Sequence, residues 1–234
     1  MAELHPNERR AYVRSAAPFT DVRLCFVGDS FTLGVGDEGQ AGWVGRLVRD
    51  HGHRGMRITY YNLGIRSETS SQVAERWESE VRPRLRPDLP GGVVLSVGVN
   101  DTMPANAAMH PVERSVSNLQ KIVDGVRACG WPMLIVGLLP VADPDHNRRI
   151  GRQNLAYSHW CSCHGVQYVD VFKNMLESAT WMSQVALVDG HHPGPAGYAE
   201  LTEDLMESWD AWILTLVGHR EPLNETNSYG KAEV

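Results

Sequence analysis

RLCFVGDSFTLGVGD, residues 23–37, joins a mostly apolar run to a turn that carries Asp29 and Ser30. The run Val22–Val27 stops at Gly28, and a continuous apolar run of this length is typical of a strand covered on both faces. Ser30 therefore follows directly after a buried strand. A serine in this position either caps a helix or acts as a nucleophile, and the two roles are compatible.

Four further apolar runs predict the rest of a sheet. Each is bounded by Gly, Pro, Asn or Asp, and they cover Ile58–Leu63, Val93–Val97, Met133–Leu138 and Val166–Val171. Segments with helical spacing lie between them. Strictly alternating strands and helices joined by right-handed crossovers predict an α/β fold: a doubly wound, five-stranded parallel sheet with helices on both faces.

Two of the predicted helices have clear boundaries. The first lies between Pro111 and Gly130, with apolar residues at steps of three and four. The last begins at the PGPAGY segment and ends at Gly218. Its apolar stripe consists of Tyr198, Leu201, Leu205, Trp209, Trp212 and Leu216.

The length of 234 residues fits one large domain. We expect an N-terminal extension at 1–20, one main domain at 21–218 and a polar C-terminal tail at 219–234. There is no internal repeat.

Composition excludes several classes of partner. The chain has 22 basic and 28 acidic residues, a net charge of −6, and no concentrated basic patch, which argues against a nucleic-acid partner. No apolar run is long enough to span a bilayer, and no secretory signal is visible, so we expect a cytoplasmic protein without stable membrane insertion. The four cysteines lack disulfide or zinc spacing, so neither a metal nor a cofactor is predicted.

In a parallel sheet, reactive groups belong on the loops that follow the carboxyl ends of the strands. Asp29 and Ser30 follow the first predicted strand, Gly64 the second, and Asn100 the third, so we expect them at one edge. The DGHHPG segment, residues 189–194, enters the last helix and can close the same edge.

A serine nucleophile needs a base and an acid that orients the base. Asp189 and His192 are three residues apart, a spacing that places both side chains on one face of a helix-like turn. Asp189 can then hold one imidazole nitrogen of His192 while the other faces Ser30. The alternative is an exposed histidine pair, and for His191 we retain that interpretation.

Acyl transfer also needs hydrogen-bond donors for the developing oxyanion. The candidates are the backbone N–H groups of Ser30 and Gly64 and the side-chain amide of Asn100. Singly, Gly64 is also compatible with a plain turn, and Asn100 with a turn or a helix cap.

These residues resemble the SGNH hydrolases, also called GDSL-type esterases and lipases. FVGDSFTLGVG, the glycine of NLGIRS, VGVND and DGHHP occur in the order of that family, over about residues 23–216. The resemblance implies a three-layer, flavodoxin-like fold and a Ser-His-Asp hydrolase of esters or thioesters. By motif position, Ser30 matches the nucleophile, His192 the base, Asp189 its partner, and Gly64 and Asn100 the oxyanion-hole residues. Phe31 replaces the leucine of the family name, and IRSETS lacks the second glycine often found near Gly64.

We therefore expect a serine esterase for small ester substrates, with short acyl chains because no large inserted cap domain is visible. A transacylase or a carbohydrate deacetylase would use the same residues. GVGDEG, residues 34–39, formally matches a dinucleotide-binding glycine motif, so a non-catalytic, nucleotide-binding flavodoxin-like protein is a further alternative. The oligomeric state cannot be inferred from the sequence.

Overall fold

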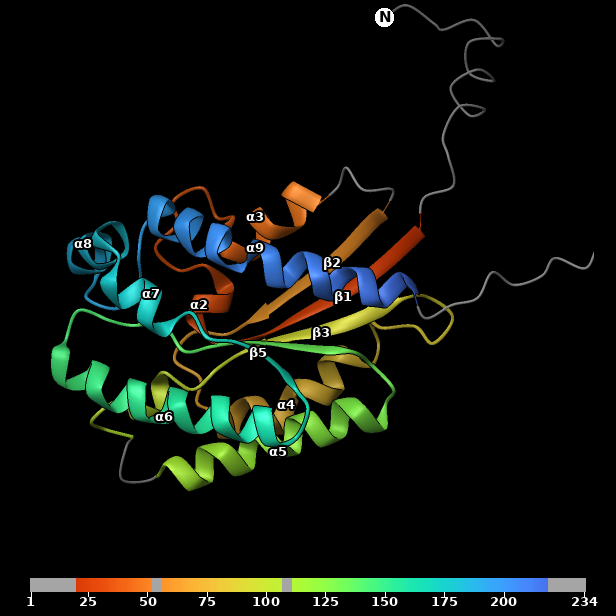
Figure 1. The fold of residues 1–234 in the computed structure, drawn as a ribbon, viewed down its shortest axis with the longest axis horizontal. Coiled ribbons are helices and arrows are strands. Elements are labelled where there is room, and N and C mark those ends of the chain that lie inside the picture. Colours follow the sequence, from red (N-terminus) through yellow and green to blue (C-terminus); the bar gives the residue numbers. More distant parts are fainter. Residues whose placement is uncertain (1–19, 52–55, 107–110, 219–234) are drawn as a thin grey trace, which may run out of the picture.

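A five-stranded parallel sheet forms the centre of the described part of the protein (Figure 1). The computed structural model describes residues 20–51, 56–106 and 111–218. The sheet order is β2-β1-β3-β4-β5. The strands are β1 (Thr20–Gly28), β2 (Met56–Gly64), β3 (Gly91–Ser96), β4 (Met133–Val136) and β5 (Gln167–Val169). This is the flavodoxin-like order, which confirms the predicted fold class. The predicted tail at 219–234 and the predicted extension, apart from Thr20, lie outside the described residues.

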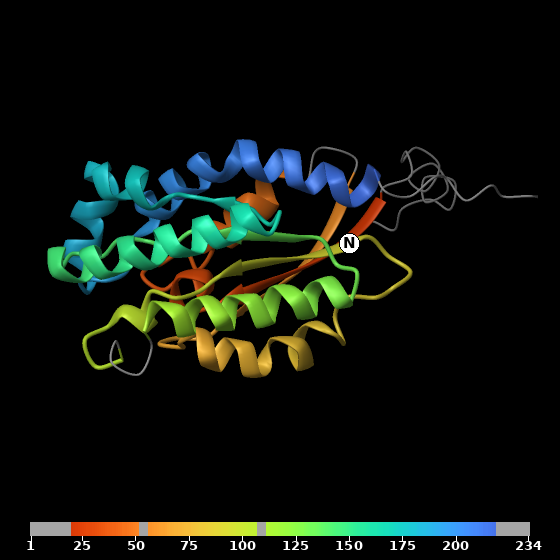
Figure 2. The same cartoon turned by 60° about the horizontal axis from the view of Figure 1, so that its bottom comes forward.

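Helices cover both faces of the sheet, as expected for parallel strands joined by crossovers. The helical elements are α2 (Ser30–Leu33), α3 (Gly42–His51), α4 (Ser70–Val81), the 3₁₀ turn η1 (Asn100–Thr102), α5 (Val112–Ala128), α6 (Pro144–Cys163), α7 (Phe172–Glu177), α8 (Ala179–Val188) and α9 (Pro195–Gly218). Helices α3 and α9 pack together on one face, and α4, α5 and α6 form the layer on the other (Figures 1 and 2).

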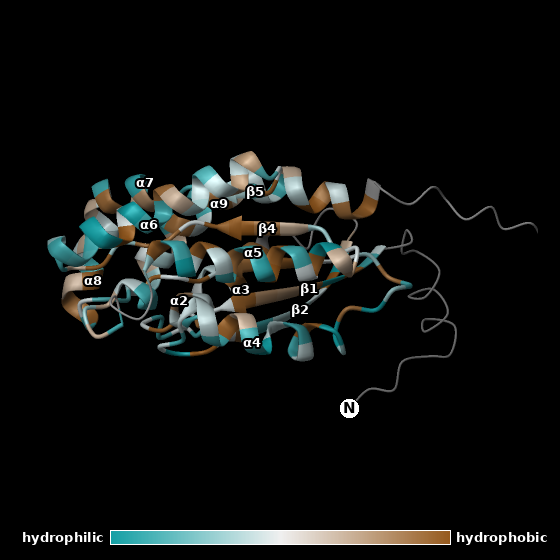
Figure 3. Cartoon of the chain, turned by 90° about the horizontal axis from the view of Figure 1, so that it is seen from below, coloured by the Kyte–Doolittle hydropathy of each residue, from teal (hydrophilic) through white to brown (hydrophobic). Residues whose placement is uncertain are grey.

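The central strands form the core. In β1 the side chains from Leu24 to Val27 are fully buried, and in β3 the same holds for Val93 and Leu95. In Figure 3, β1 and β4 are largely brown, whereas the surrounding helices carry many teal residues. The predicted apolar stripe of the last helix is also buried, since its six residues are each at most 4% exposed. Burial of this apolar area is the main force that holds α9 on the sheet.

The strands begin and end within two residues of the predicted positions, and β5 is shorter than predicted. It has three residues instead of six, and its side chains are exposed or only half-buried because it lies at the edge of the sheet. Asp170 ends it by accepting a hydrogen bond from the backbone N–H of Phe172 at 3.1 Å. No described helix has the length and apolar character needed to span a membrane.

Candidate active site

The turn after β1 places Ser30 at the start of a short helix. Asp29 is the N-cap of α2, since its side chain accepts a hydrogen bond from the backbone N–H of Phe31 at 3.0 Å. The alternative in which Ser30 caps the helix is therefore wrong. Ser30 is the first residue of α2 and its hydroxyl is available for another partner.

That partner is His192, which lies 162 positions later in the chain. The Oγ of Ser30 is 2.7 Å from the Nε2 of His192, and the Nδ1 of His192 is 2.7 Å from the Oδ2 of Asp189. Because the Asp189 carboxylate can only accept, Nδ1 carries the proton and Nε2 is the acceptor for the Ser30 hydroxyl. The predicted order of three side chains is thus present at hydrogen-bonding distances.

Asp189 also shapes the loop that carries His192. Its Oδ1 accepts hydrogen bonds from the backbone N–H groups of His191 at 2.9 Å and His192 at 2.8 Å. Burial acts to raise the pKa of Asp189, but these bonds and the His192 ring lower it to about 2. Asp189 is therefore ionised throughout the neutral range.

Burial lowers the pKa of His192 below its usual 6.5, against the opposing effect of Asp189. The ring of Phe31 contributes to this burial, with its centroid 5.0 Å from that of His192. Trp181 stacks on Phe31 and is fully buried, so it supports the site from the core. A neutral imidazole at pH 7 is able to accept a proton from Ser30.

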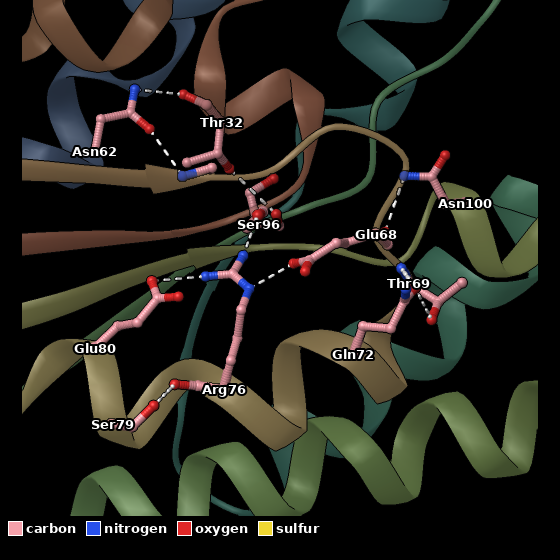
Figure 4. A network of polar contacts seen from close by, with 12 residues as sticks. Thr32, Asn62, Glu68, Thr69, Gln72, Arg76, Ser79, Glu80, Ser96 and Asn100 are labelled. Carbon is pink, nitrogen blue, oxygen red and sulfur yellow. Dashed lines mark hydrogen bonds and ion pairs between the residues drawn. The ribbon is translucent and has the colours of Figure 1, made fainter.

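Gly64 is at the predicted edge of the sheet, but its N–H already has a partner. It donates to the side-chain Oδ1 of Asn62 at 3.0 Å, and Asn62 also donates to the backbone carbonyl of Thr32 at 2.8 Å (Figure 4). A Cβ on Gly64 would lie 2.3 Å from the backbone nitrogen of Leu33. The observed role of Gly64 is therefore close packing of β2 against α2.

Asn100 lies at the start of η1 and faces the loop that follows β2. Its side-chain Nδ2 donates to the backbone carbonyl of Glu68 at 2.9 Å (Figure 4). The backbone carbonyl of Asn100 accepts a hydrogen bond from the side chain of Asn106 at 2.9 Å. A side-chain amide has two N–H groups. One donates to Glu68, and the second has no partner among the described residues.

Ser67 is a residue that the sequence analysis did not identify. It is in the left-handed region with φ of 63°, although it has a Cβ, and such residues are concentrated at functional sites. Its backbone N–H has no hydrogen-bond partner among the described residues, and it precedes Glu68, which contacts Asn100. The available signal was that IRSETS, the segment that contains this strained backbone, has no glycine.

Other carboxylates near the site have structural partners. Asp101 is fully buried and accepts a hydrogen bond from the backbone N–H of Ser70 at 2.7 Å, which braces the start of α4. Asp37, in the GVGDEG loop, accepts from the backbone N–H groups of Gly39 at 3.0 Å and Gly42 at 2.8 Å. A carboxylate thus occupies one N–H group of this motif and adds negative charge to the loop, which argues against the nucleotide-binding alternative.

Two hollows of about 600 Å³ and 350 Å³ lie away from these residues. They are lined by residues at the starts of the parallel strands, including Gly91, Pro132 and Val166, and so occupy the opposite edge of the sheet. Within the described parts of the chain, no group of three potential metal ligands occurs.

Comparison with known proteins agrees with this architecture. The family model described as the GDSL-like lipase/acylhydrolase family matches residues 26–200. The lipase/acylhydrolase from Enterococcus faecalis has 22% identity and a TM-score of 0.67, over 81% of this chain and 95% of that one. A lipolytic protein of the G-D-S-L family from Veillonella parvula has 16% identity and a TM-score of 0.64, over 80% and 97%. Axe2, an acetylxylan esterase from Geobacillus stearothermophilus, has 19% identity and a TM-score of 0.66, over 83% and 96%. No curated protein matches the sequence.

Proposed function

The chain belongs to the GDSL-like lipase/acylhydrolase family and is an ester-cleaving hydrolase, and from this premise we propose that Ser30, His192 and Asp189 are its catalytic triad. The observation that carries the proposal is the continuous pair of 2.7 Å contacts from the Ser30 hydroxyl through His192 to Asp189. These contacts join a turn near the start of the domain to a loop near its end, and they have the nucleophile–base–acid order that acyl transfer requires.

The reaction proceeds in two halves. Ser30 Oγ attacks the ester carbonyl while its proton passes to Nε2 of His192, and Asp189 stabilises the imidazolium that forms. The tetrahedral intermediate collapses, the alcohol leaves with the proton from Nε2, and an acyl-enzyme remains on Ser30. A water molecule then gives a proton to Nε2 of His192 and attacks the acyl carbon. The bond from this carbon to Ser30 Oγ breaks, and Nε2 returns the proton to Oγ as the acid leaves.

The negative charge on the carbonyl oxygen needs preorganised donors. We assign two of them to the backbone N–H of Ser30, which has no partner among the described residues, and to the second N–H of the Asn100 amide. The Gly64 N–H would serve only if its bond to Asn62 opened. The N–H of Ser67, on the strained loop beside Asn100, is therefore our third candidate.

The proposed substrates are small esters with short acyl chains, and the proposed acyl acceptor is water. The helices and loops between the strands include no inserted cap domain in the described ranges, which favours an open cleft over a long acyl tunnel. A transacylase or a carbohydrate deacetylase would share the triad and differ only in the acceptor or the alcohol. We propose that the reaction uses neither a metal nor another cofactor, because no step above requires one. We also propose that the protein acts in the cytoplasm.

The first experiment is Ser30→Ala with p-nitrophenyl acetate. The variant is expected to keep the wild-type melting temperature and to lose turnover and labelling by a fluorophosphonate, because only the hydroxyl is removed. A folded variant with wild-type turnover would refute the triad. A panel of acyl-chain lengths and acetylated saccharides defines the substrate, and an added alcohol acceptor reveals transacylation through a new ester product.

A further inference from the structure

Arg76, on α4, is a largely buried cation at the base of the candidate active site. Its side chain is 14% exposed and its guanidinium has three partners (Figure 4). Nε is 2.6 Å from Oε2 of Glu68, Nη1 is 3.0 Å from Oε2 of Glu80, and Nη2 donates to the backbone carbonyl of Gly28 at 3.0 Å. The planar guanidinium holds these three groups in fixed directions.

Two of these partners belong to segments that carry the proposed chemistry. Gly28 is the last residue of β1 and lies two positions before Ser30. Glu68 lies in the loop between β2 and α4, and its 13% exposed side chain is as buried as that of Arg76. A single side chain therefore ties the nucleophile turn to the next loop along the sheet edge.

The contact continues from Glu68 to Asn100. The backbone carbonyl of Glu68 accepts one N–H of the Asn100 amide at 2.9 Å. Because the two N–H groups of an amide lie in one plane at a fixed angle, holding the first sets the direction of the second. The position of Glu68 thus determines where the free N–H of Asn100 points, and also where the neighbouring N–H of Ser67 lies.

We propose that Arg76 and Glu68 are a positioning pair that holds the oxyanion donors in register with the Ser30 nucleophile. Neither residue touches substrate; both act through the backbone of Gly28 and through Asn100. The inference rests on the proposed function. A displacement of the donors by about 1 Å is enough to lower the rate by on the order of 10²-fold, because the donors must match the oxyanion geometry.

Glu80 provides a matched control. It pairs with the same guanidinium, from one turn further along α4, but touches neither the turn after β1 nor the loop with Glu68. Glu68→Ala and Glu80→Ala each remove one carboxylate from Arg76. They are expected to lower the melting temperature by similar amounts, so any difference in activity reports positioning and not stability.

The assay is kcat and KM for p-nitrophenyl acetate at a temperature well below unfolding. Glu68→Ala is expected to lower kcat by about 100-fold with little change in KM, and Arg76→Lys by about 10-fold, because lysine cannot hold three partners in one plane. Glu68→Gln, which keeps an acceptor oxygen, should recover part of the loss. Glu80→Ala should stay within about 2-fold of the wild type, because its carboxylate contacts no segment of the site.

An alkyl boronic acid supplies the second readout, because its tetrahedral adduct on Ser30 occupies the oxyanion site. Its inhibition constant should rise in parallel with the loss of kcat/KM across the Glu68 and Arg76 variants. Wild-type kcat in Glu68→Ala, or equal losses in Glu68→Ala and Glu80→Ala, would overturn the inference. If either of these results is found while Ser30→Ala is inactive, the positioning pair is refuted and the proposed function stands. An active Ser30→Ala would refute the proposed function itself.

Discussion

Replacement of Asp189 by Asn separates the orienting role of this residue from its role in the loop. Asn retains an oxygen in place of Oδ1, so the two bonds from the backbone N–H groups of His191 and His192 are kept. The amide NH₂ replaces Oδ2 and faces the Nδ1 of His192, which is 2.7 Å away. Two donors cannot share this contact, so the imidazole changes tautomer and places its proton on Nε2, opposite Ser30.

The altered tautomer removes the acceptor for the Ser30 proton. The expected loss in kcat/KM is about 10³- to 10⁴-fold, equivalent to about 4–5 kcal/mol of transition-state stabilisation. The loss of stability is expected to be much smaller, about 1 kcal/mol or less, because a single bond is lost and the Asp189 side chain is 38% exposed. The change in rate should therefore far exceed the change in the free energy of unfolding.

Kinetics with p-nitrophenyl acetate from pH 5 to 9, together with calorimetric unfolding, measure both quantities. Asp189→Ala is the comparison, since it also removes the bonds to the loop and should unfold at a lower temperature than Asp189→Asn. A rate for Asp189→Asn within tenfold of the wild type would refute the orienting role. So would a rate loss that merely follows the melting temperatures of the two variants.

Three further changes test the electrostatics and the backbone of the site. Arg66→Gln should raise the pKa of His192, because the cation of Arg66 helps to lower it. At low salt, the acid limb of the kcat/KM profile should therefore move to higher pH in the variant. An acid limb at the same pH in the variant and the wild type would contradict this. Burial raises the pKa of Asp29 from 3.8 to about 7, so the wild type loses stability as pH rises through this range. Asp29→Asn keeps an oxygen that can cap α2, and its free energy of unfolding should rise by up to about 4 kcal/mol relative to that of the wild type between pH 4 and 8. If the free energies of unfolding of the two proteins changed in parallel with pH, this prediction would be wrong. Ser67→Gly should relieve the positive φ, raise the free energy of unfolding by about 1 kcal/mol and retain activity, whereas loss of activity would assign a function to the Ser67 side chain.

Local patterns were sufficient to predict the architecture. Buried parallel strands are continuous apolar runs, and capped helices repeat their apolar residues every three or four positions, so both can be recognised over short distances. The alternation of the two elements, joined by right-handed crossovers, leads to the observed parallel sheet with helices on both faces. The length of the edge strand β5 was overestimated because Val166 and Val171 on either side of it are apolar but lie outside its ladder of paired residues.

The chemistry of the candidate site was predictable in part for the same reason. Ser30 follows a recognisable strand, and Asp189 and His192 share a short loop whose spacing already favours a hydrogen bond. The residue types and their order therefore predicted which side chains meet. The identity of the helix cap was not predictable, because Asp29 and Ser30 are both good capping residues and only the backbone conformation decides between them.

By itself, then, the sequence determined the fold, the edge of the sheet at which the polar residues gather, and the family. Only the tertiary structure decided how individual donors are used: that Gly64 gives its N–H to Asn62, that Ser67 takes the strained backbone, and that Arg76 reaches Gly28 across 48 positions. The physical reason is that each hydrogen bond is a competition between partners brought close by folding. Sequence spacing describes the partners on one segment but not those that distant segments supply.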